Sequence, residues 1–535
     1  MRHLRIAPNW LRYFIIMVLV LGVFFRFVNL DKKVFWHDET YTMLRLSGYT
    51  TDEVKRQVFN SRIISAESLF RYQTINSERN LSDTIRSLAI DDPQHPPLYY
   101  IIARVWVQVF GQTFANSVIA VRSLSAVISL LVIPAMYWLC WELFKVPLGV
   151  CWIAIALVLS SPLQFAYAQE AREYILWAVT ILVSSAALLR AIRLDSKPKY
   201  VESPVFNWGI YSLSLALSLY TFLLSGFVFI AHAMYVIITN KFRWNQTVKN
   251  LVVASLVSFL FFSPWLLILM GNFYQFEQTT AWTGTQMPLI NLIQSWILQI
   301  TRIFFDFNGN LDNIFSYFIA IFFLILVGYA IYFLYLTTGI KTWLFIISLI
   351  CIPALPLVLP DLLFGGMRSI SERYLIPSYL GIQIAVAYLF AYQVNSGKFT
   401  RRQIWQVMGV LVISLGLISI FVSSVSETWW NKVVSDGNPE VARIINQSQN
   451  SLLISNDVGI NYGNVFSLSY LLEPETKFLL VQQRNSLSRG VNKMNESIFI
   501  LNPSNSFRRE IEGQYRLRAY PVYVDRYYSL LKLGK

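Results

Sequence analysis

Long apolar blocks separated by short polar segments occupy most of the chain. An α-helix needs about 20 apolar residues to cross the roughly 30 Å hydrocarbon core of a bilayer. About eleven blocks meet this length, and they cover residues 11–30, 118–144, 148–166, 174–192, 206–222, 223–239, 251–271, 313–336, 342–360, 374–393 and 405–425. The pattern predicts an α-helical polytopic membrane protein with about eleven transmembrane helices.

One further apolar block, residues 98–110, is too short to span a bilayer. It carries Arg104 and Gln108 four positions apart, so both side chains share one helical face. The block is interpreted as an interfacial or re-entrant helix. It lies in a long loop, residues 31–117, which is expected to carry interfacial helices, and a second loop, residues 272–312, has room for another.

The pattern changes after the last apolar block. Residues 439–446 are helix-like, short apolar runs at 452–455, 478–481 and 498–501 are strand-like, and residues 508–513 are polar. We therefore expect a transmembrane module over residues 1–425 and a small soluble α/β domain over residues 426–535. The C-terminal segment shows no catalytic signature of its own.

Composition supports the membrane interpretation. It argues against a nucleic-acid-binding protein and against a disulfide framework or a cysteine metal cluster. Hydrophobic residues make up 55% of the chain and charged residues only 14%. The net charge of +14 does not indicate nucleic-acid binding, because Lys and Arg lie in short loops between apolar blocks. The three cysteines, Cys140, Cys151 and Cys351, lie within or beside apolar blocks and are interpreted as packed hydrophobic residues.

The basic loops set the expected orientation. With a cytoplasmic N terminus, eleven crossings place the basic segments inside, as the positive-inside rule requires. These segments are Lys145, residues 190–199, residues 241–249, Lys341 and residues 398–402. Residues 31–117, 167–173, 272–312, 361–373 and the C-terminal domain then lie outside. We expect a multi-pass plasma-membrane protein whose chemistry occurs on the extracytoplasmic face.

Two adjacent carboxylates follow the first apolar block. They are Asp38 and Glu39 in FWHDETY, residues 35–41. In extended backbone, neighbouring side chains point to opposite faces, so one carboxylate can enter a cleft while the other holds backbone or a cation. A solvated acidic loop with aromatic membrane anchors has the same spacing.

A second polar motif, DDPQHPPLYY at residues 91–100, precedes the short apolar block. Its prolines are also ordinary helix-start residues, and a single His is more often structural than catalytic. Asp92 and His95, together with Glu39, are oxygen and nitrogen donors suited to a divalent cation that bridges a phosphate and a carboxylate. A metal at these three residues is one hypothesis, and no cofactor is required by the pattern.

Two arginines lie at the expected outer ends of helices. Arg172 belongs to QEAREY, residues 169–174, and Arg373 belongs to SERYLIP, residues 371–377. Arginines at a lipid boundary often only extend toward the headgroups. The alternative is an anion site, because a guanidinium matches phosphate oxygens bidentately.

These motifs, in this order along the chain, resemble those of the dolichyl-phosphate-mannose protein mannosyltransferase-like family (glycosyltransferase family 39-like), within the GT-C superfamily. The resemblance implies a GT-C fold over residues 1–425 and a transferase of the cell envelope. Such an enzyme moves a hexosyl or pentosyl group from a polyprenyl-phosphate carrier to a hydroxyl of a lipid, glycan or protein acceptor. The C-terminal domain departs from the protein mannosyltransferases, which weakens the case for a protein acceptor.

The resemblance also implies roles for individual residues. Asp38 matches the aspartate that activates the acceptor, and its neighbour Glu39 is also expected to be catalytic. Arg172, Arg373 and Tyr374 are expected to contact the donor phosphate. The donor or acceptor pocket is expected to include His37, His95, Glu170 and Tyr174.

The residue types fit an inverting displacement, in which a carboxylate deprotonates the acceptor and arginines stabilise the departing phosphate. The main alternative is a lipid-linked glycan flippase or transporter. Transporters tend to carry ionisable residues at the bilayer midplane and paired repeats, which the pattern lacks. A polymerase or ligase of lipid-linked glycans and a non-catalytic sugar-binding protein are further alternatives.

Overall fold

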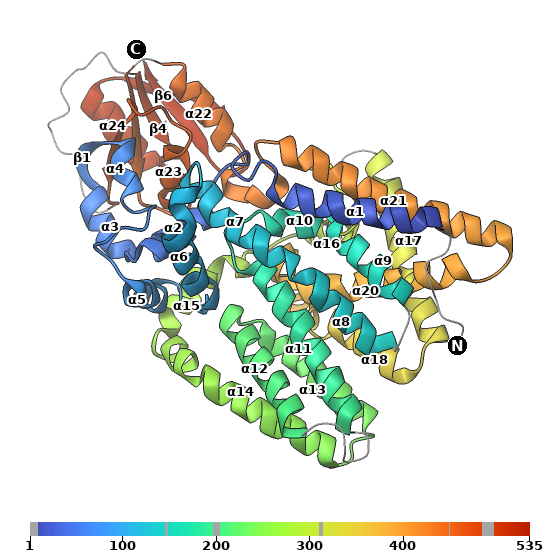
Figure 1. Ribbon diagram of the computed structural model, residues 1–535. Helices are drawn as coiled ribbons and strands as arrows, with labels where there is room; N and C mark the ends of the chain where they lie inside the picture. The colour runs from blue at the N-terminus through green and yellow to red at the C-terminus, as the bar shows by residue number, and fades with distance from the viewer. Residues whose placement is uncertain are drawn as a thin grey trace. The chain divides into compact units, whose positions relative to one another are not determined.

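The computed structural model describes residues 9–144, 148–195, 204–309, 314–448, 450–483 and 497–534. The chain divides into two compact units, each built from segments that are distant in sequence (Figure 1). The helical unit comprises Met1–Val28, Asp92–Tyr99 and Arg122–Ser424, and the sheet unit comprises Asn29–Asp91, Tyr100–Val121 and Val425–Lys535. Three parts of the loops expected from the sequence, Lys145 and residues 196–199 and 310–312, lie outside the described residues.

Among the described residues, seven helices are long and apolar enough to cross a bilayer. They are α1 (Asn9–Phe27), α7 (Ser117–Leu130) continued by α8 (Val132–Phe144), α11 (Tyr174–Asp195), α14 (Gln246–Gly271), α17 (Ile314–Thr337), α20 (Ile376–Asn395) and α21 (Phe399–Val425). Two bent pairs raise the number to as many as nine: α9 (Leu148–Leu159) with α10 (Pro162–Ala168), bent by 64°, and α18 (Ile340–Cys351) with α19 (Leu355–Phe364), bent by 46°. The expectation of a polytopic helical membrane protein is confirmed.

The remaining two of the eleven expected spans form shorter or more polar helices. α13 (Ser225–Thr239) has 15 residues, which reach only about 22 Å along a helix axis. α12 (Pro204–Thr221) carries Asn207 and three serines that are all buried in the protein. The hydropathy pattern located both helices, and their length and polarity set them apart from the seven long spans.

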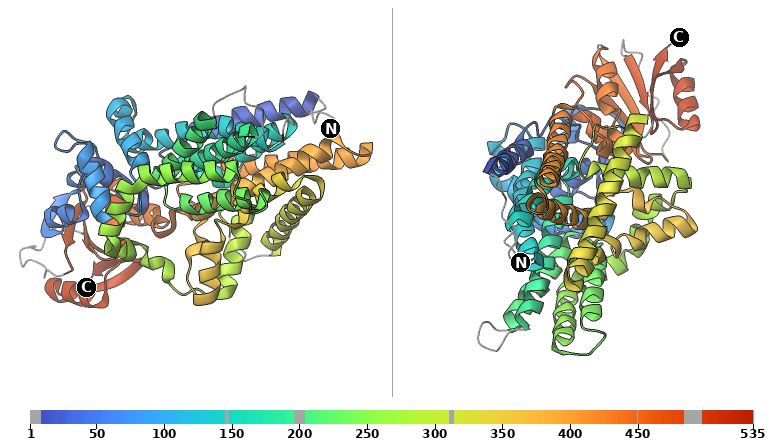
Figure 2. Two further views of the ribbon diagram at one scale, coloured as in Figure 1. Left: turned by 90° about the horizontal axis from the view of Figure 1, so that it is seen from below. Right: turned by 90° about the vertical axis from the view of Figure 1, so that its right-hand side faces the viewer.

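Two helices lie at the centre of the helical unit. In the apolar stretch of α20, 94% of the residues are buried, and in that of α11 83% are, against 33% for α14. A helix that is apolar and covered on all sides is an interior helix. Figure 2 shows from two sides that the long helices of this unit lie alongside one another. The QEAREY motif ends on the first residue of α11 and the SERYLIP motif ends in the first turn of α20, so the central helices position both motifs.

The sheet unit is built on a six-stranded sheet with the order β1-β3-β2-β4-β6-β5. The strands are β1 (Asn60–Ser65), β2 (Ser451–Asn456), β3 (Lys477–Val481), β4 (Ser497–Leu501), β5 (Arg518–Val524) and β6 (Ser529–Gly534). β2 runs parallel to both of its neighbours, β3 and β4. The outer pairings, β1 with β3, β4 with β6 and β6 with β5, are antiparallel.

Both faces of this sheet are covered by helices. Successive side chains of a strand point to opposite faces. Leu453 packs with α22 (Asn438–Asn446) and α23 (Asn461–Ser469), whereas Ile454 packs with α24 (Asn505–Tyr515). Strands buried on both faces are apolar throughout rather than alternating, which explains why β2, β3 and β4 gave clear strand signals in the sequence.

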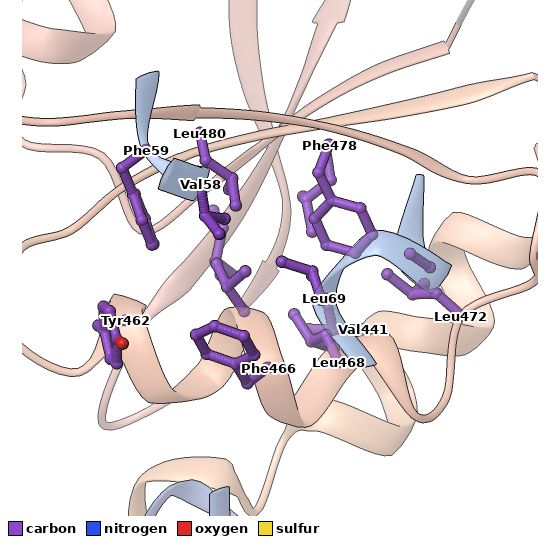
Figure 3. Packing of buried hydrophobic residues seen from close by; sticks show 14 of the residues in the cluster. Val58, Phe59, Leu69, Val441, Tyr462, Phe466, Leu468, Leu472, Phe478 and Leu480 are labelled. Atoms are coloured by element: carbon purple, nitrogen blue, oxygen red, sulfur yellow. The ribbon is translucent and has the colours of Figure 1, made fainter. Parts of the chain in front are cut away.

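Part of the long loop after α1 belongs to this core. β1 pairs with β3, and Val58, Phe59 and Leu69 pack in the same cluster as Phe466 and Phe478 (Figure 3). These loop side chains come from the ends of α3 (Thr51–Val58) and α4 (Ala66–Phe70) and the residue between α3 and β1. The sheet therefore joins two segments that are about 400 residues apart in sequence.

The short apolar block forms α6 (Leu98–Phe110), with the bounds that the sequence predicts. Its Arg104 is fully buried and donates hydrogen bonds to Leu46 O, to Arg79 O and, at 3.0 Å, to Thr84 Oγ1. This arginine therefore holds the helix to neighbouring loop segments of the protein. The interfacial location of α6 stays a prediction.

We predict that Phe466→Ala destabilises the sheet unit by about 3–5 kcal/mol, because it leaves a cavity in a core shared by the loop and the C-terminal strands. Phe466 is 1% exposed. The measurement is denaturant unfolding of the purified full-length protein in detergent. Val524→Ala is the control, because Val524 is 67% exposed and should change stability by less than about 0.5 kcal/mol. Equal stability of the two variants would contradict the packing in Figure 3.

Candidate functional site

FWHDETY begins helix α2 (His37–Ser47). The expectation of extended backbone at the two carboxylates is therefore wrong. Trp36 is the residue before the first turn, and Glu39 Oε2 accepts a hydrogen bond from the Trp36 backbone N–H at 3.4 Å. This bond satisfies a donor that the start of a helix leaves without an intrahelical partner. Asp38 and Glu39 both lie in the first turn, where the helix dipole stabilises negative charge.

The two carboxylates differ in their surroundings. Glu39 is fully buried, and its Oε2 lies 3.2 Å from Lys432 Nζ, which is also buried. The same Nζ lies 5.5 Å from the centroid of the Trp36 ring. His37 and Asp38 are only half-buried. Asp38 is therefore the more accessible carboxylate of the pair.

In the helical unit, the segment before α6 is held by side chains of other helices. Trp265 Nε1 donates to Pro93 O at 3.1 Å, and Thr279 Oγ1 donates to Gln94 Oε1 at 3.0 Å. Gln94 Nε2 in turn donates to Asp92 Oδ1 at 3.2 Å. These contacts fix the turn that carries His95.

The His95 ring lies between two charged side chains. Its Nδ1 is 2.8 Å from Glu173 Oε1, and its Nε2 is 3.1 Å from Arg172 Nη2. A carboxylate only accepts hydrogen bonds and a guanidinium only donates them. Nδ1 of His95 therefore faces the acceptor and Nε2 faces the donor. We call His95, Arg172 and Glu173 the Glu173 cluster.

Within this cluster, the pKa of Glu173 is shifted by its neighbours. It is fully buried, which by itself would raise its pKa, but the nearby Arg172 guanidinium and the His95 ring lower the pKa of Glu173 to about 2. Its Oε2 lies 3.5 Å from Arg172 Nε. Glu173 is absent from the site residues expected from the sequence. The available signal was its place beside an arginine at the start of a mainly apolar helix, where a buried charge needs a partner.

The two arginine motifs meet at one aromatic ring. The guanidinium carbons of Arg172 and Arg373 each lie 5.6 Å from the centroid of the Tyr174 ring. Arg373 also lies 5.5 Å from the Tyr374 ring and 5.9 Å from the Trp282 ring. Two guanidinium groups beside one aromatic ring offer a set of N–H donors, and the Glu173 carboxylate offsets part of their positive charge. This arrangement suits an anion with several oxygen atoms.

Hydrogen bonds anchor both motifs to the bundle. Gln169 Nε2 donates to Phe25 O and Val28 O at 2.9 and 2.8 Å, which ties QEAREY to the end of α1. Glu170, which the resemblance assigns to the pocket, is 1% exposed. Glu372 Oε1 accepts from Arg302 Nη1 at 2.6 Å, which fixes the residue before Arg373.

The residues proposed as metal ligands have protein partners instead. Glu39 pairs with Lys432, Asp92 with Gln94, and His95 with members of the Glu173 cluster. Within the part of the chain that the structure describes, no three His, Cys, Asp or Glu side chains gather around one point suited to a metal ion. A metal at Glu39, Asp92 and His95 stays a hypothesis, and any bound cation would draw further oxygen ligands from a phosphate.

A cavity of about 340 Å³ lies in the sheet unit. Its walls combine aromatic rings with charged groups, among them Lys32, Lys33, Phe35, Phe70 and Tyr470. The Tyr470 ring lies 4.9 Å from the Phe35 ring and 5.0 Å from the Phe70 ring. Aromatic faces beside polar groups can hold a sugar ring through its apolar C–H face and its hydroxyls.

No protein-family model matches this sequence, and no curated protein matches it significantly. Solved structures do match. ArnT from Cupriavidus metallidurans bound to undecaprenyl phosphate is 12% identical, with 98% of each chain covered and a TM-score of 0.55. ArnT in the apo state gives 11% identity, 98% coverage of each chain and a TM-score of 0.55. An oligosaccharyltransferase from Archaeoglobus fulgidus is 15% identical over 88% of this chain and 64% of that chain, with a TM-score of 0.49.

The similarity to ArnT extends over nearly the full length of both chains. The chain therefore has the same fold as ArnT, which agrees with the GT-C fold expected from the sequence. The structural similarity shows a shared fold, but identity near 12% does not show a shared reaction, which has to be argued from the site.

We predict that the free energy of unfolding decreases as the pH falls from about 4.5 toward about 2, because Glu173 becomes protonated over this range. The folded pKa is about 2 and the ordinary value is 4.5, so the folded state favours the charged form. The stabilisation is complete above the higher value and disappears as protonation approaches the lower one. Unfolding temperatures in detergent between about pH 3 and 7 should therefore fall more steeply for wild type than for Glu173→Gln. Glu475→Gln, at an exposed position, should follow wild type, and parallel curves for all three proteins would contradict the prediction.

Proposed function

We propose that this GT-C protein is a membrane glycosyltransferase that moves a sugar from a polyprenyl-phosphate carrier to an acceptor hydroxyl. The observation that carries the proposal is the meeting of Arg172 and Arg373 at Tyr174. Two motifs 200 residues apart supply two guanidinium groups to one ring, at the starts of the two central helices. The undecaprenyl phosphate bound to ArnT supports a carrier of the same chemical class.

The donor phosphate would lie between the two arginines. A sugar phosphate is an activated donor, and its reaction places negative charge on the departing phosphate. Arg172 and Arg373 are suited to hold that charge, because guanidinium groups contact phosphate oxygens bidentately. His95 and Glu173 fix the orientation of Arg172 and partly offset its charge. Tyr174 and Tyr374 would shield the site from water.

Asp38 would act as the general base. Its half-buried carboxylate, in the first turn of α2, would take the proton of the acceptor hydroxyl. The acceptor oxygen then bonds to the anomeric carbon while the bond from that carbon to the phosphate oxygen breaks, and the phosphate keeps the electron pair. A single displacement of this kind inverts the anomeric configuration. The orientation expected from the basic loops puts this step on the extracytoplasmic face of the plasma membrane.

The sheet-unit cavity would hold a saccharide part of the acceptor. The rings of Phe35, Phe70 and Tyr470 offer apolar faces, and Asp31, Lys32 and Lys33 offer charges of both signs. Phe35 lies three residues before Asp38 in the same loop. Aromatic faces beside polar groups favour a glycan or glycolipid acceptor over a peptide.

A flippase or transporter remains the rival function. The two bent helix pairs are the feature that favours it, because transporters often use broken helices. However, carrier movement across the bilayer would not need a base at Asp38. An assay that measures both sugar transfer and carrier movement separates the two functions.

We predict that Asp38→Asn lowers the rate of transfer by about 10²–10⁴-fold, because the acceptor hydroxyl loses its base. The measurement is single-turnover transfer from radiolabelled polyprenyl-phosphate sugars, in membranes that contain comparable amounts of folded protein. Asp52→Asn is the matched control, because Asp52 is an exposed carboxylate in the first turn of the neighbouring helix α3. We expect it to leave the rate unchanged.

Unchanged transfer by Asp38→Asn would remove Asp38 as the base. Carrier movement without any sugar transfer in wild type would replace the proposal by the flippase function. The same assay with EDTA addresses the cation hypothesis. We expect the rate to persist, because the two arginines supply the charge, and a loss reversed by added Mg²⁺ or Mn²⁺ would show that a cation is needed.

A further inference from the structure

We infer that Lys432, in the segment that follows the last long helix, is a positioning residue for Asp38. The inference rests on the proposed function, because it concerns the same general base. The C-terminal segment has no catalytic motif, but by this inference it takes part in the reaction by positioning Asp38.

The first support is the contact between Lys432 and the start of α2. Lys432 Nζ lies 3.2 Å from Glu39 Oε2, and the exposed fractions of the two side chains are 1% and 0%. The same carboxylate oxygen accepts the Trp36 backbone N–H. Lys432 therefore holds the side chain that completes the first turn, next to Asp38.

The second support is a set of contacts from the same segment. The backbone N–H of His37 donates to Ser435 Oγ at 3.0 Å, and Ser435 Oγ donates to Asn464 Oδ1 at 2.6 Å. The backbone N–H of Val34 donates to Glu427 O at 2.8 Å. The residues on both sides of Asp38 are thus held by residues that come about 400 positions later in the chain.

The third support is backbone strain beside Lys432. Val433 has φ 36° and ψ −103°, a conformation that a β-branched residue rarely adopts. A strained backbone conformation of this kind persists only where surrounding contacts hold it in place. Such conformations are frequent at functional sites. Here Lys432 and Ser435, on either side of Val433, must both reach α2.

A buried ion pair by itself adds little to the stability of a protein. Removing two charges from water costs free energy that their attraction often only balances, and well-packed apolar side chains of similar size are often as stabilising. The charged pair instead fixes the orientation of the Glu39 carboxylate. It thereby fixes the helix turn that carries Asp38. A general base displaced by about 1 Å can lose about 10² in rate.

The test compares four full-length proteins in nanodiscs with a radiolabelled polyprenyl-phosphate sugar as donor: wild type, Lys432→Met, Lys432→Arg and the double variant Glu39→Met with Lys432→Met. For Lys432→Met we expect kcat to fall about 100-fold, while KM for the donor changes less than about twofold, because the proposed phosphate contacts are elsewhere. Lys432→Arg keeps the charge and should recover much of kcat. The double variant removes the buried charge, so its unfolding temperature should return toward that of wild type while kcat stays low.

Lys532→Met is the matched control, because Lys532 is a partly buried lysine of the same unit that lies over the Phe499 ring. We expect it to keep the kcat of wild type. A normal kcat in Lys432→Met, or a recovery of kcat together with stability in the double variant, would overturn the inference by showing a purely structural role. Absence of transfer in wild type would instead refute the proposed function, and the inference with it.

Discussion

The buried carboxylate of Glu173 is the constraint on which the candidate site depends. A charge without a partner in a low-dielectric interior costs several kcal/mol, so its partners must be held firmly in place. Glu173 has two of them, Arg172 beside it in the sequence and His95 from the segment before α6. Satisfying one carboxylate thus fixes two distant segments and turns Arg172 toward Tyr174. Because Arg373 lies against the same ring, the meeting of the two arginines follows from this pairing.

The same principle acts in the sheet unit. Glu39 is buried and is matched by Lys432, and the pair links the start of α2 to the C-terminal segment. β1 and the side chains around it complete the core of the C-terminal sheet, so the loop after α1 and the C-terminal residues form one folded unit. The candidate base Asp38 therefore sits on a rigid element supported by two parts of the chain. A catalytic group needs this kind of support, since small displacements are costly in rate.

Much of the fold was predictable because bilayer and sheet impose simple patterns. The apolar blocks predicted the spans, residues 98–110 gave the bounds of α6, and β2, β3 and β4 appeared as apolar runs because both faces of the sheet are covered. β1 was missed because its sequence, NSRIIS, has a weak pattern and its partner strand lies about 400 residues away. The helical start of α2 was missed because Trp36, unlike Ser, Thr, Asp or Asn, is not a typical cap.

The sequence predicted which types of residue form the candidate site, but it did not predict which of these residues contact one another. Arginines beside aromatic residues at helix starts gave a signal for an anion site, and the structure brings Arg172 and Arg373 to one ring. No local pattern indicates that Lys432 meets Glu39 or that His95 meets Glu173, because these contacts arise only when distant segments pack together.

The measurement that tests the central claim most directly is a cryo-EM structure of the protein in nanodiscs with undecaprenyl phosphate. The account predicts that the phosphate lies within hydrogen-bonding distance of both Arg172 and Arg373, next to Tyr174. A well-ordered phosphate bound away from both arginines, with the Glu173 cluster intact, would contradict it.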